Sequence, residues 1–282
     1  MFQPGHLEPI DYLVVGHLTN DLTPEGPRIG GTAAYSALTA QALGVRVGIV
    51  TSWGEEVPLG PLASIPIINY PTDRSTEFEN IFTPDGRIQY VRNTAPLLDL
   101  YMVPEAWRTA SIVHLGPVAQ EVEPGLVRGF PTALIGVTPQ GWLRSWDGGG
   151  RVHAAEWPES QFVLERAGAT VISIEDVGGN EDRIEEMAAS ARILAVTEAH
   201  MGCRIYWNGD VRRFPAPDIE EIDPNGAGDI FAASFFTRLW TTRDPWEAAR
   251  FATQLAAQSV QRRGLDSIPT REEIEASMVE IF

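Results

Sequence analysis

The stretch EIDPNGAGDIFAASFF (residues 221–236) decides the fold. Gly226, Ala227 and Gly228 form a predicted turn with almost no side chains, and an apolar helix pattern follows directly. The backbone N–H groups of such a turn can approach an anion closely, and the helix N-terminus adds a partial positive charge. Asp229 stands in the first turn of this helix, where a carboxylate is also a good helix-start residue. The stretch therefore predicts either an anion-binding turn with an acid behind it or a simple capped helix.

Short apolar runs alternate with helix patterns over most of the chain, which is typical of α/β proteins with a buried, mostly parallel sheet. The predicted strands are Tyr12–Gly16, Val45–Thr51, Ser111–Leu115, Ala133–Val137, Ala169–Ile174 and Ile193–Thr197. The predicted helices are Thr32–Gly44, Glu181–Ala191, Gly228–Trp240 and Pro245–Arg262. The alternation continues on both sides of Asp147–Gly150, so this stretch is predicted to be a loop within a single domain of residues 1–282.

Two segments depart from this alternation. Ile65–Pro96 contains turn-punctuated runs on both sides of residues 83–86 and no helix pattern, which predicts a small antiparallel excursion outside the main sheet. Arg204–Phe214 is predicted to be a second hairpin that turns at Asn208 and Gly209.

The composition excludes several classes of function. Lys and Arg number 21 against 38 Asp and Glu, a formal charge of −17, which disfavours binding to nucleic acid or to an acidic membrane surface. The single cysteine, Cys203, allows neither an internal disulfide nor a thiolate metal cluster. The start does not resemble a signal peptide, and no apolar run approaches the ~20 residues of a membrane-spanning helix. We expect a cytoplasmic protein.

The segment DPNGAGD (residues 223–229) resembles the Asp-Thr-Thr/Asn-Gly-Ala-Gly-Asp signature of the ribokinase-like, or PfkB-type, carbohydrate kinase family. Pro224 departs from the commonest residue, although proline occurs there in some branches, including inositol kinases. Other stretches resemble family elements in the same order along nearly the whole chain. They are VVGHLTNDL (14–22), IGGTAAYSALTAQALG (29–44), LAVTEAHMGCRIYWNGDVRRFPAP (194–217) and SVQRRGLDSIPTREEI (259–274).

The resemblance implies a ribokinase-like fold, in which a central, mostly parallel sheet is flanked by helices on both faces. A small β-sheet lid would come from about residues 17–28 and 67–93 and would close over a small-molecule acceptor to exclude water. Because lids in this family often pair between subunits, a homodimer through the lid is a further expectation, which rests on the resemblance alone.

The resemblance also implies an ATP-dependent kinase. Asp229 would be the general base, and the amides of Gly226, Ala227, Gly228 and Asp229 would form an anion hole for the transferred phosphoryl group. The residues implied for acceptor binding are Asp21, Gly30, Gly31 and Thr32. The residues implied for ATP binding are Ser173, Thr197, Gly202, Asn225, Thr253 and Gly264.

The resemblance also implies two bound cations. Asp176 would hold Mg²⁺ through water, and K⁺ would lie beside the turn near Asp223, Asn225 and Ser267. The sequence departs from the family at two positions: Ser173 replaces an asparagine, and Ala199 replaces a glycine of Thr-x-Gly-x-x-Gly.

The acceptor is predicted less sharply than the reaction. GHLTNDL, GGTAAYSA and DPNGAGD look closest to the inositol-kinase-like branch, which favours a cyclitol such as myo-inositol. A nucleoside, ribose or a fructose-type sugar are alternative acceptors, and a non-catalytic ligand-binding relative is an alternative from another class. P-loop, H-E-x-x-H and G-x-S-x-G motifs are absent.

Overall fold

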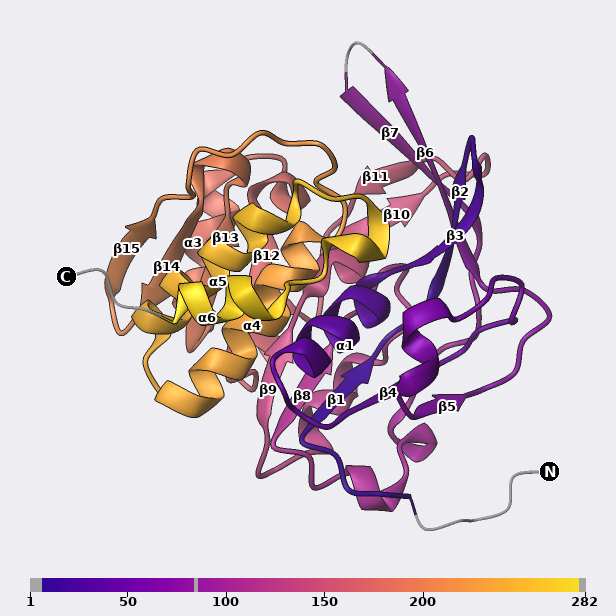
Figure 1. Ribbon diagram of the computed structural model, residues 1–282, viewed down its shortest axis with the longest axis horizontal. Coiled ribbons are helices and arrows are strands. Elements are labelled where there is room, and N and C mark those ends of the chain that lie inside the picture. Colours follow the sequence, from indigo (N-terminus) through magenta and orange to yellow (C-terminus); the bar gives the residue numbers. More distant parts are fainter. Residues whose placement is uncertain (1–6, 84–85, 279–282) are drawn as a thin grey trace.

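The computed structural model describes residues 7–83 and 86–278, and it has an α/β architecture built on one large sheet (Figure 1). Its strand order is β15-β14-β13-β12-β9-β8-β1-β4-β5, and all neighbouring pairs are parallel except β13–β14 and β14–β15. The strands are β1 (Tyr12–Val15), β4 (Val47–Thr51), β5 (Ile67–Asn69), β8 (Ile112–Leu115), β9 (Leu134–Val137), β12 (Ala169–Ser173), β13 (Ile193–Thr197), β14 (Cys203–Trp207) and β15 (Asp210–Phe214). The predicted mostly parallel sheet is confirmed.

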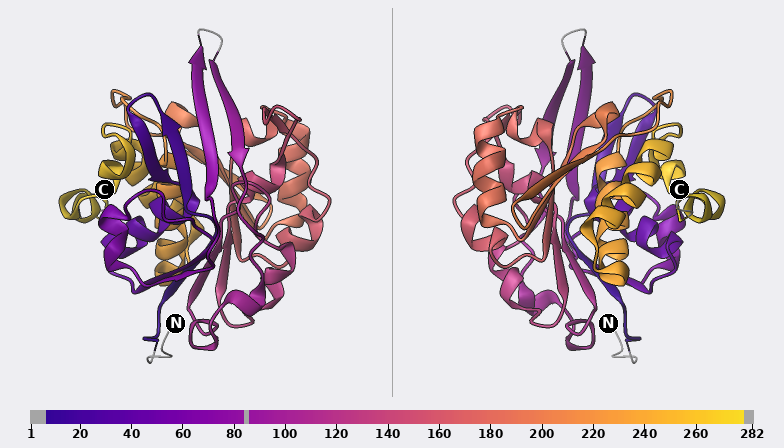
Figure 2. Two further views of the ribbon diagram at one scale, coloured as in Figure 1. Left: turned by 90° about the vertical axis from the view of Figure 1, so that its right-hand side faces the viewer. Right: turned by 90° about the vertical axis from the view of Figure 1, so that its left-hand side faces the viewer.

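Helices cover both faces of this sheet, and the two turned views show one layer on each side (Figure 2). The helices are α1 (Thr32–Ala42), α2 (Ser160–Leu164), α3 (Glu181–Ser190), α4 (Ala227–Thr242), α5 (Pro245–Ser259) and α6 (Arg271–Ser277). Strand β1 shows why two layers are needed, because all four of its residues are buried. Leu13 and Val15 enter the core on the α3 side, whereas Tyr12 and Val14 enter the core beneath α1 and α4.

A separate four-stranded sheet, which we call the lid sheet, stands above the carboxyl ends of the main strands (Figure 1). It consists of β2 (Thr19–Thr23), β3 (Gly26–Gly30), β6 (Thr76–Thr83) and β7 (Gly86–Asn93) in the order β3-β2-β6-β7. The predicted second segment began too early, because Ile67–Asn69 pairs with β4 as the edge strand of the main sheet. Of the expected lid turn at residues 83–86, Pro84 and Asp85 lie outside the described residues.

The predicted loop Asp147–Gly150 is present and joins the strands of a short, unpredicted hairpin, β10 (Arg144–Trp146) and β11 (Val152–Ala154). The hairpin contacts the lid sheet, since Val91 N donates to Gly150 O over 2.8 Å and Tyr90 bridges to Arg151. The sequence segment after β9 therefore reaches from the main sheet to the lid sheet.

Candidate functional site

A cleft of about 810 Å³ lies between the carboxyl ends of the main strands and the lid sheet. In open parallel sheets, ligands bind at this edge of the strands. Most of the predicted site residues line the cleft, although they come from five separate segments of the chain. These are Asp21, Gly31, Thr32, Ser173, Asp176, Thr197, Gly202, Asn225, Gly226, Ala227, Gly228, Asp229 and Thr253.

The glycine turn precedes α4 as the sequence indicates. Gly226 has a φ of 82°, and a Cβ there would lie 2.3 Å from the ring of Tyr35 on α1. Only glycine combines this backbone conformation with this close approach. Within the described residues no side chain caps the N-terminus of α4, and a Cβ at Gly228 would meet no atom within 4 Å. Ala227 N donates to Pro224 O over 3.2 Å, so the amides of Gly228 and Asp229 are the ones open to an anion in the cleft.

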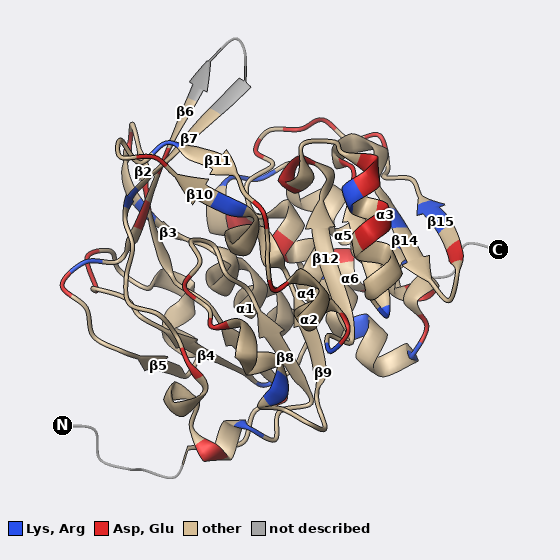
Figure 3. Cartoon of the chain, turned by 180° about the vertical axis from the view of Figure 1, so that it is seen from behind, with Lys and Arg blue, Asp and Glu red and all other residues tan. Residues whose placement is uncertain are grey.

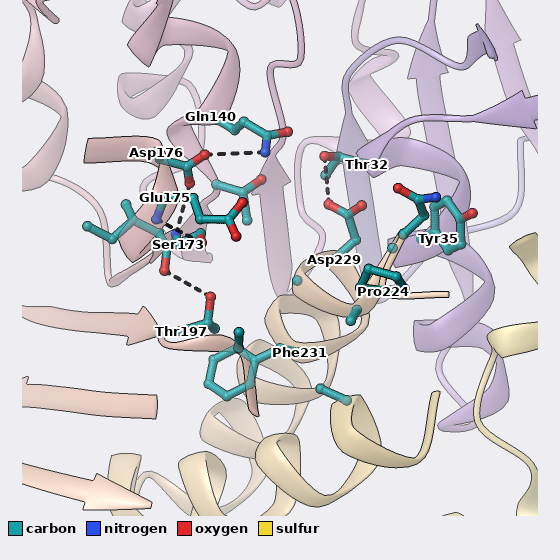
Figure 4. A pocket seen from close by; sticks show the side chains of 18 of the residues that line it. Thr32, Tyr35, Gln140, Ser173, Glu175, Asp176, Thr197, Pro224, Asp229 and Phe231 are labelled. Carbon is teal, nitrogen blue, oxygen red and sulfur yellow. Dashed lines mark hydrogen bonds between the residues drawn. The ribbon is translucent and has the colours of Figure 1, made fainter. Parts of the chain in front are cut away.

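Asp229 lies behind this turn, in the first turn of α4, and Thr32 of α1 points toward it (Figure 4). Thr32 Oγ1 donates to Asp229 Oδ1 over 2.7 Å. Burial raises the pKa of Asp229 to about 6, although the Thr32 hydrogen bond and the positive charge of Arg144 act in the opposite direction. A carboxylate with this pKa is ionised at neutral pH and is still basic enough to accept a proton from a hydroxyl as that hydroxyl attacks.

Asp21 marks the lid side of the cleft. Its Oδ1 accepts a hydrogen bond from Thr19 Oγ1 over 2.8 Å. Gly30 lies under this carboxylate rather than on the cleft wall, and a Cβ there would lie 2.2 Å from Asp21 Oδ2. Gly31, with a φ of 85°, begins α1, and a Cβ there would lie 2.6 Å from His17 O. Both glycines thus let β3 and α1 pass close to the strand that carries Asp21.

The wall opposite Asp229 carries Ser173, Glu175 and Asp176 at the end of β12 (Figure 4). Asp176 accepts hydrogen bonds from Ser173 N at 2.8 Å and from Gln140 Nε2 at 3.3 Å, so it caps the short 3₁₀ helix Ile174–Val177. Burial is the largest influence on Asp176 and raises its pKa. Carboxylate oxygens of this kind suit Mg²⁺ bound through water, because the cation would relieve the buried charge. Within the described residues, no group of three or more His, Cys, Asp or Glu forms a metal cluster.

The turn predicted to bind ATP follows β13. Ala199 has a φ of 52°, the left-handed conformation that costs a residue with a Cβ about 1–2 kcal/mol. Gly202 has a φ of 96°, and a Cβ there would lie 2.0 Å from Phe214 O. Thr253 of α5 reaches the same part of the cleft and holds Cys203 Sγ at 3.3 Å.

Apolar side chains from two elements line this end of the cleft and form what we call the apolar slot. They are Ala256, Ala257 and Val260 on α5 and its end, and Ala216, Pro217 and Ile219 on the loop after β15. Such a slot suits a flat ring, because it offers apolar contact without occupying the space between its walls.

Three more of the predicted residues, Asp223, Gly264 and Ser267, do not line the cleft. The carboxylate of Asp223 accepts from Asn225 N at 3.0 Å, from Asn225 Nδ2 at 2.7 Å and from Gly264 N at 3.2 Å. It therefore joins the turn to the 3₁₀ helix Gly264–Ser267. The hydroxyl of Ser267 is buried and has no hydrogen-bond partner among the described residues.

Sequence reasoning missed Arg144, Gln140 and Thr138, which line the cleft on the segment after β9. The chain has no lysine, and within the described residues Arg144 and Arg151 are the only arginines on the cleft wall. The charge of Arg144 lowers the pKa of both Asp229 and Asp176. Elsewhere acidic residues predominate, notably along α3 (Figure 3). Only spatial proximity to Asp229 identifies Arg144, because 85 residues separate the two in the sequence.

Residues 166–271, which include the glycine turn and Asp229, match the family described as pfkB family carbohydrate kinase. This segment of the chain is similar to the PfkB carbohydrate kinases. The chain is similar to a cytidine kinase of Thermococcus kodakarensis, at 24% identity over 90% of this chain and 98% of the relative. It is also 25% identical to a fructokinase of Escherichia coli, over 93% of this chain and 97% of that protein. An inositol 3-kinase of Oryza sativa subsp. japonica is 25% identical, over 92% of this chain and 70% of the relative.

Solved structures confirm the ribokinase-like fold. A pyrophosphate-dependent myo-inositol-1 kinase that was converted into a myo-inositol-3 kinase superimposes with a TM-score of 0.80 at 16% identity, covering 95% of this chain and 99% of the other. The ribokinase of Arabidopsis thaliana in complex with ribose and ATP gives a TM-score of 0.72 at 16% identity, covering 96% and 99%. Within the described residues, no helix is both long and apolar enough to cross a membrane.

Proposed function

We propose that this protein transfers the terminal phosphoryl group of ATP to a hydroxyl of a small sugar, polyol or nucleoside. One observation carries the proposal: Asp229, held by Thr32, lies directly behind an uncapped glycine turn in a cleft large enough for two small ligands. A capped helix alone would need neither the open amides nor a carboxylate with a pKa near neutrality.

In the proposed reaction Asp229 accepts the proton of the acceptor hydroxyl as its oxygen attacks phosphorus. The open amides at the start of α4, those of Gly228 and Asp229, donate to the oxygens of the transferred phosphoryl group, where negative charge develops. Thr32 orients the carboxylate by donating to its Oδ1, which leaves Oδ2 for the acceptor hydroxyl. Catalysis then depends on positioning and on preorganised dipoles.

Two further features would stabilise the negative charge of the ATP phosphates. Arg144 contributes positive charge between the walls that carry Asp229 and Asp176. Asp176 and Glu175 would hold Mg²⁺ through water, and the ion would neutralise phosphate charge when bound. The apolar slot between α5 and the loop after β15 would hold the nucleotide base, which supports ATP over pyrophosphate as the donor.

We favour a cyclitol such as myo-inositol as the acceptor, with Asp21 binding its hydroxyls. The support is the likeness to an inositol 3-kinase and to the structure of a myo-inositol kinase. Nucleosides and fructose are the alternatives, supported by a cytidine kinase and a fructokinase at similar identity. The lid sheet would close over the acceptor, and a homodimer through the lid remains a prediction.

The test is an ATP-consumption screen with Mg²⁺ against myo-inositol, ribose, fructose and cytidine. We expect one class of acceptor to turn over, and Asp229→Asn to lower its rate on the order of 10²–10⁴-fold. Asp182→Asn on the exposed side of α3 is the control, because it removes the same charge far from the cleft. Retention of more than about a tenth of the rate by Asp229→Asn would contradict the role of base. Binding of ATP without transfer to any acceptor would instead indicate the non-catalytic relative.

A further inference from the structure

A chain of three polar side chains runs from the buried sheet to the floor of the cleft. The hydroxyl of Tyr12 lies 3.1 Å from Nδ1 of His114, and Nε2 of His114 lies 2.9 Å from Oγ1 of Thr138. Tyr12 and His114 are fully buried, whereas Thr138 lies at the end of β9 and lines the cleft. Neither Tyr12 nor His114 can touch a ligand, so any functional effect must pass through Thr138.

His114 is neutral in this setting. It is packed edge-on against the ring of Phe236, with centroids 5.0 Å apart, and burial lowers its pKa to about 3. A neutral imidazole donates from one ring nitrogen and accepts at the other. The direction of the whole chain of hydrogen bonds therefore depends on which nitrogen carries the proton.

The hydrogen bond with Tyr12 determines which tautomer of His114 is favoured. Within residues 7–83 and 86–278, its hydroxyl has no hydrogen-bond partner other than His114. If Nδ1 carried the proton, Tyr12 would accept, and its own hydroxyl hydrogen would stay unpaired in an apolar core at a cost of about 1–3 kcal/mol. Tyr12 therefore donates to Nδ1, and the proton of His114 lies on Nε2, which donates to Thr138.

Thr138 then has its oxygen occupied and its hydroxyl hydrogen left for the cleft. Gly116 separates it from Thr32, since a Cβ at Gly116 would lie 2.5 Å from Thr32 Cγ2 and 3.4 Å from Thr138 Oγ1. Thr32 in turn donates to Asp229. The hydroxyl of Thr138 thus lies beside the residue that orients the proposed base, in the half of the cleft that would hold the acceptor.

We propose that Thr138 is a specificity residue that donates a hydrogen bond to an oxygen of the bound acceptor, with its polarity fixed by Tyr12 and His114. The inference rests on the proposed function. It adds a chemical requirement at one point of the acceptor: a hydroxyl, ether, carboxylate or phosphate oxygen pairs with Thr138. A protonated amine at that point offers only donors, and the enzyme discriminates against it.

The test uses the acceptor that the wild-type enzyme phosphorylates in the screen. Thr138→Val replaces the hydroxyl with a methyl group of similar size, and we expect kcat/KM for the acceptor to fall about 10- to 100-fold, while KM for ATP stays unchanged. Thr138→Ser keeps the hydroxyl and should retain most of the activity. An active wild type with unchanged acceptor kinetics in Thr138→Val would overturn this inference and leave the kinase intact.

The tautomer provides a second readout that requires no substrate. Long-range ¹H–¹⁵N spectra, with His114 assigned by its contact to Phe236, should show the proton on Nε2. Tyr12→Phe removes the partner of Nδ1 and should change the nitrogen shifts of His114 together with the acceptor KM. A proton on Nδ1 in the wild type would overturn the inference even if no acceptor had been found, whereas an inactive wild type would refute the proposed function.

Discussion

At the residue scale, Asp229 shows how burial and one hydrogen bond together set the working pH of a carboxylate. Burial disfavours the charged form and raises its pKa, whereas the Thr32 hydroxyl stabilises the charged form and lowers it. The resulting value of about 6 leaves the base mostly ionised at neutral pH and makes its pKa sensitive to the Thr32 hydroxyl.

This balance predicts the pH dependence of the reaction. Because the base acts when ionised, kcat/KM should rise with pH through about 6 and then level off. Thr32→Val removes the hydrogen bond that lowers the pKa, so the acidic limb should move upward by about one pH unit. Thr32→Ser, which keeps the hydroxyl, should leave the limb in place. An acidic limb that does not move in Thr32→Val would show that Asp229 does not control it.

At the element scale, the turn after β13 holds an alanine in a conformation that favours glycine. Ala199 has a φ of 52°, so the departure from the family pattern at this residue corresponds to real backbone strain. Ala199→Gly should raise the free energy of unfolding by up to about 1 kcal/mol, measured by urea denaturation. Ala257→Gly within α5 is the matched control and should lower it by about 1 kcal/mol. Equal destabilisation by both changes would contradict the strain.

The junction between the glycine turn and the 3₁₀ helix Gly264–Ser267 is a second feature at this scale. Asp223 holds both elements through three hydrogen bonds, and a K⁺ ion beside it would order the carbonyl groups around the turn. We expect activity to rise severalfold when K⁺ replaces Na⁺ at constant ionic strength, and Asp223→Ala to blunt this response. A rate that is indifferent to the cation would exclude the ion and leave Asp223 as a structural tie.

The elements that sequence predicted best are those with long, regular patterns. The buried strands of the main sheet and helices α1, α3, α4 and α5 have such patterns, and their order was confirmed. Strand β5 and the β10–β11 hairpin were missed because their strands have only three residues each, too few to show a period. The motif located Asp229, but Thr32 was predicted only as an acceptor ligand, since no local signal relates α1 to α4.

At the scale of the whole molecule, the cleft is lined by segments from both the N-terminal and the C-terminal parts of the chain, which meet at the carboxyl ends of the main strands. One half comes from residues 19–35 and 78–89 and would hold the acceptor, and the other comes from residues 171–260 and would hold the nucleotide. The β10–β11 hairpin lies between them and supplies Arg144 and Arg151. The two halves can exclude water only if the hairpin and the lid sheet stay together as one cover.

Gly150 connects the β10–β11 hairpin to strand β7 of the lid sheet. Its φ is 84°, its carbonyl oxygen accepts from Val91 N over 2.8 Å, and a Cβ on it would lie 2.3 Å from Val91 O. Gly150→Ala should therefore separate the hairpin from β7 and admit water to the phosphates. We expect the ratio of ATP hydrolysis to acceptor phosphorylation to rise, measured as ADP formed against phosphorylated acceptor.

Gly148→Ala is the matched control, because a Cβ at that residue would meet no atom within 4 Å. It changes the same loop without touching β7, so the coupling of ATP consumption to transfer should stay at the wild-type level. If Gly150→Ala were as tightly coupled as Gly148→Ala, the hairpin and the lid sheet would not act as one cover. Exclusion of water would then depend on the lid sheet without its contact to the hairpin.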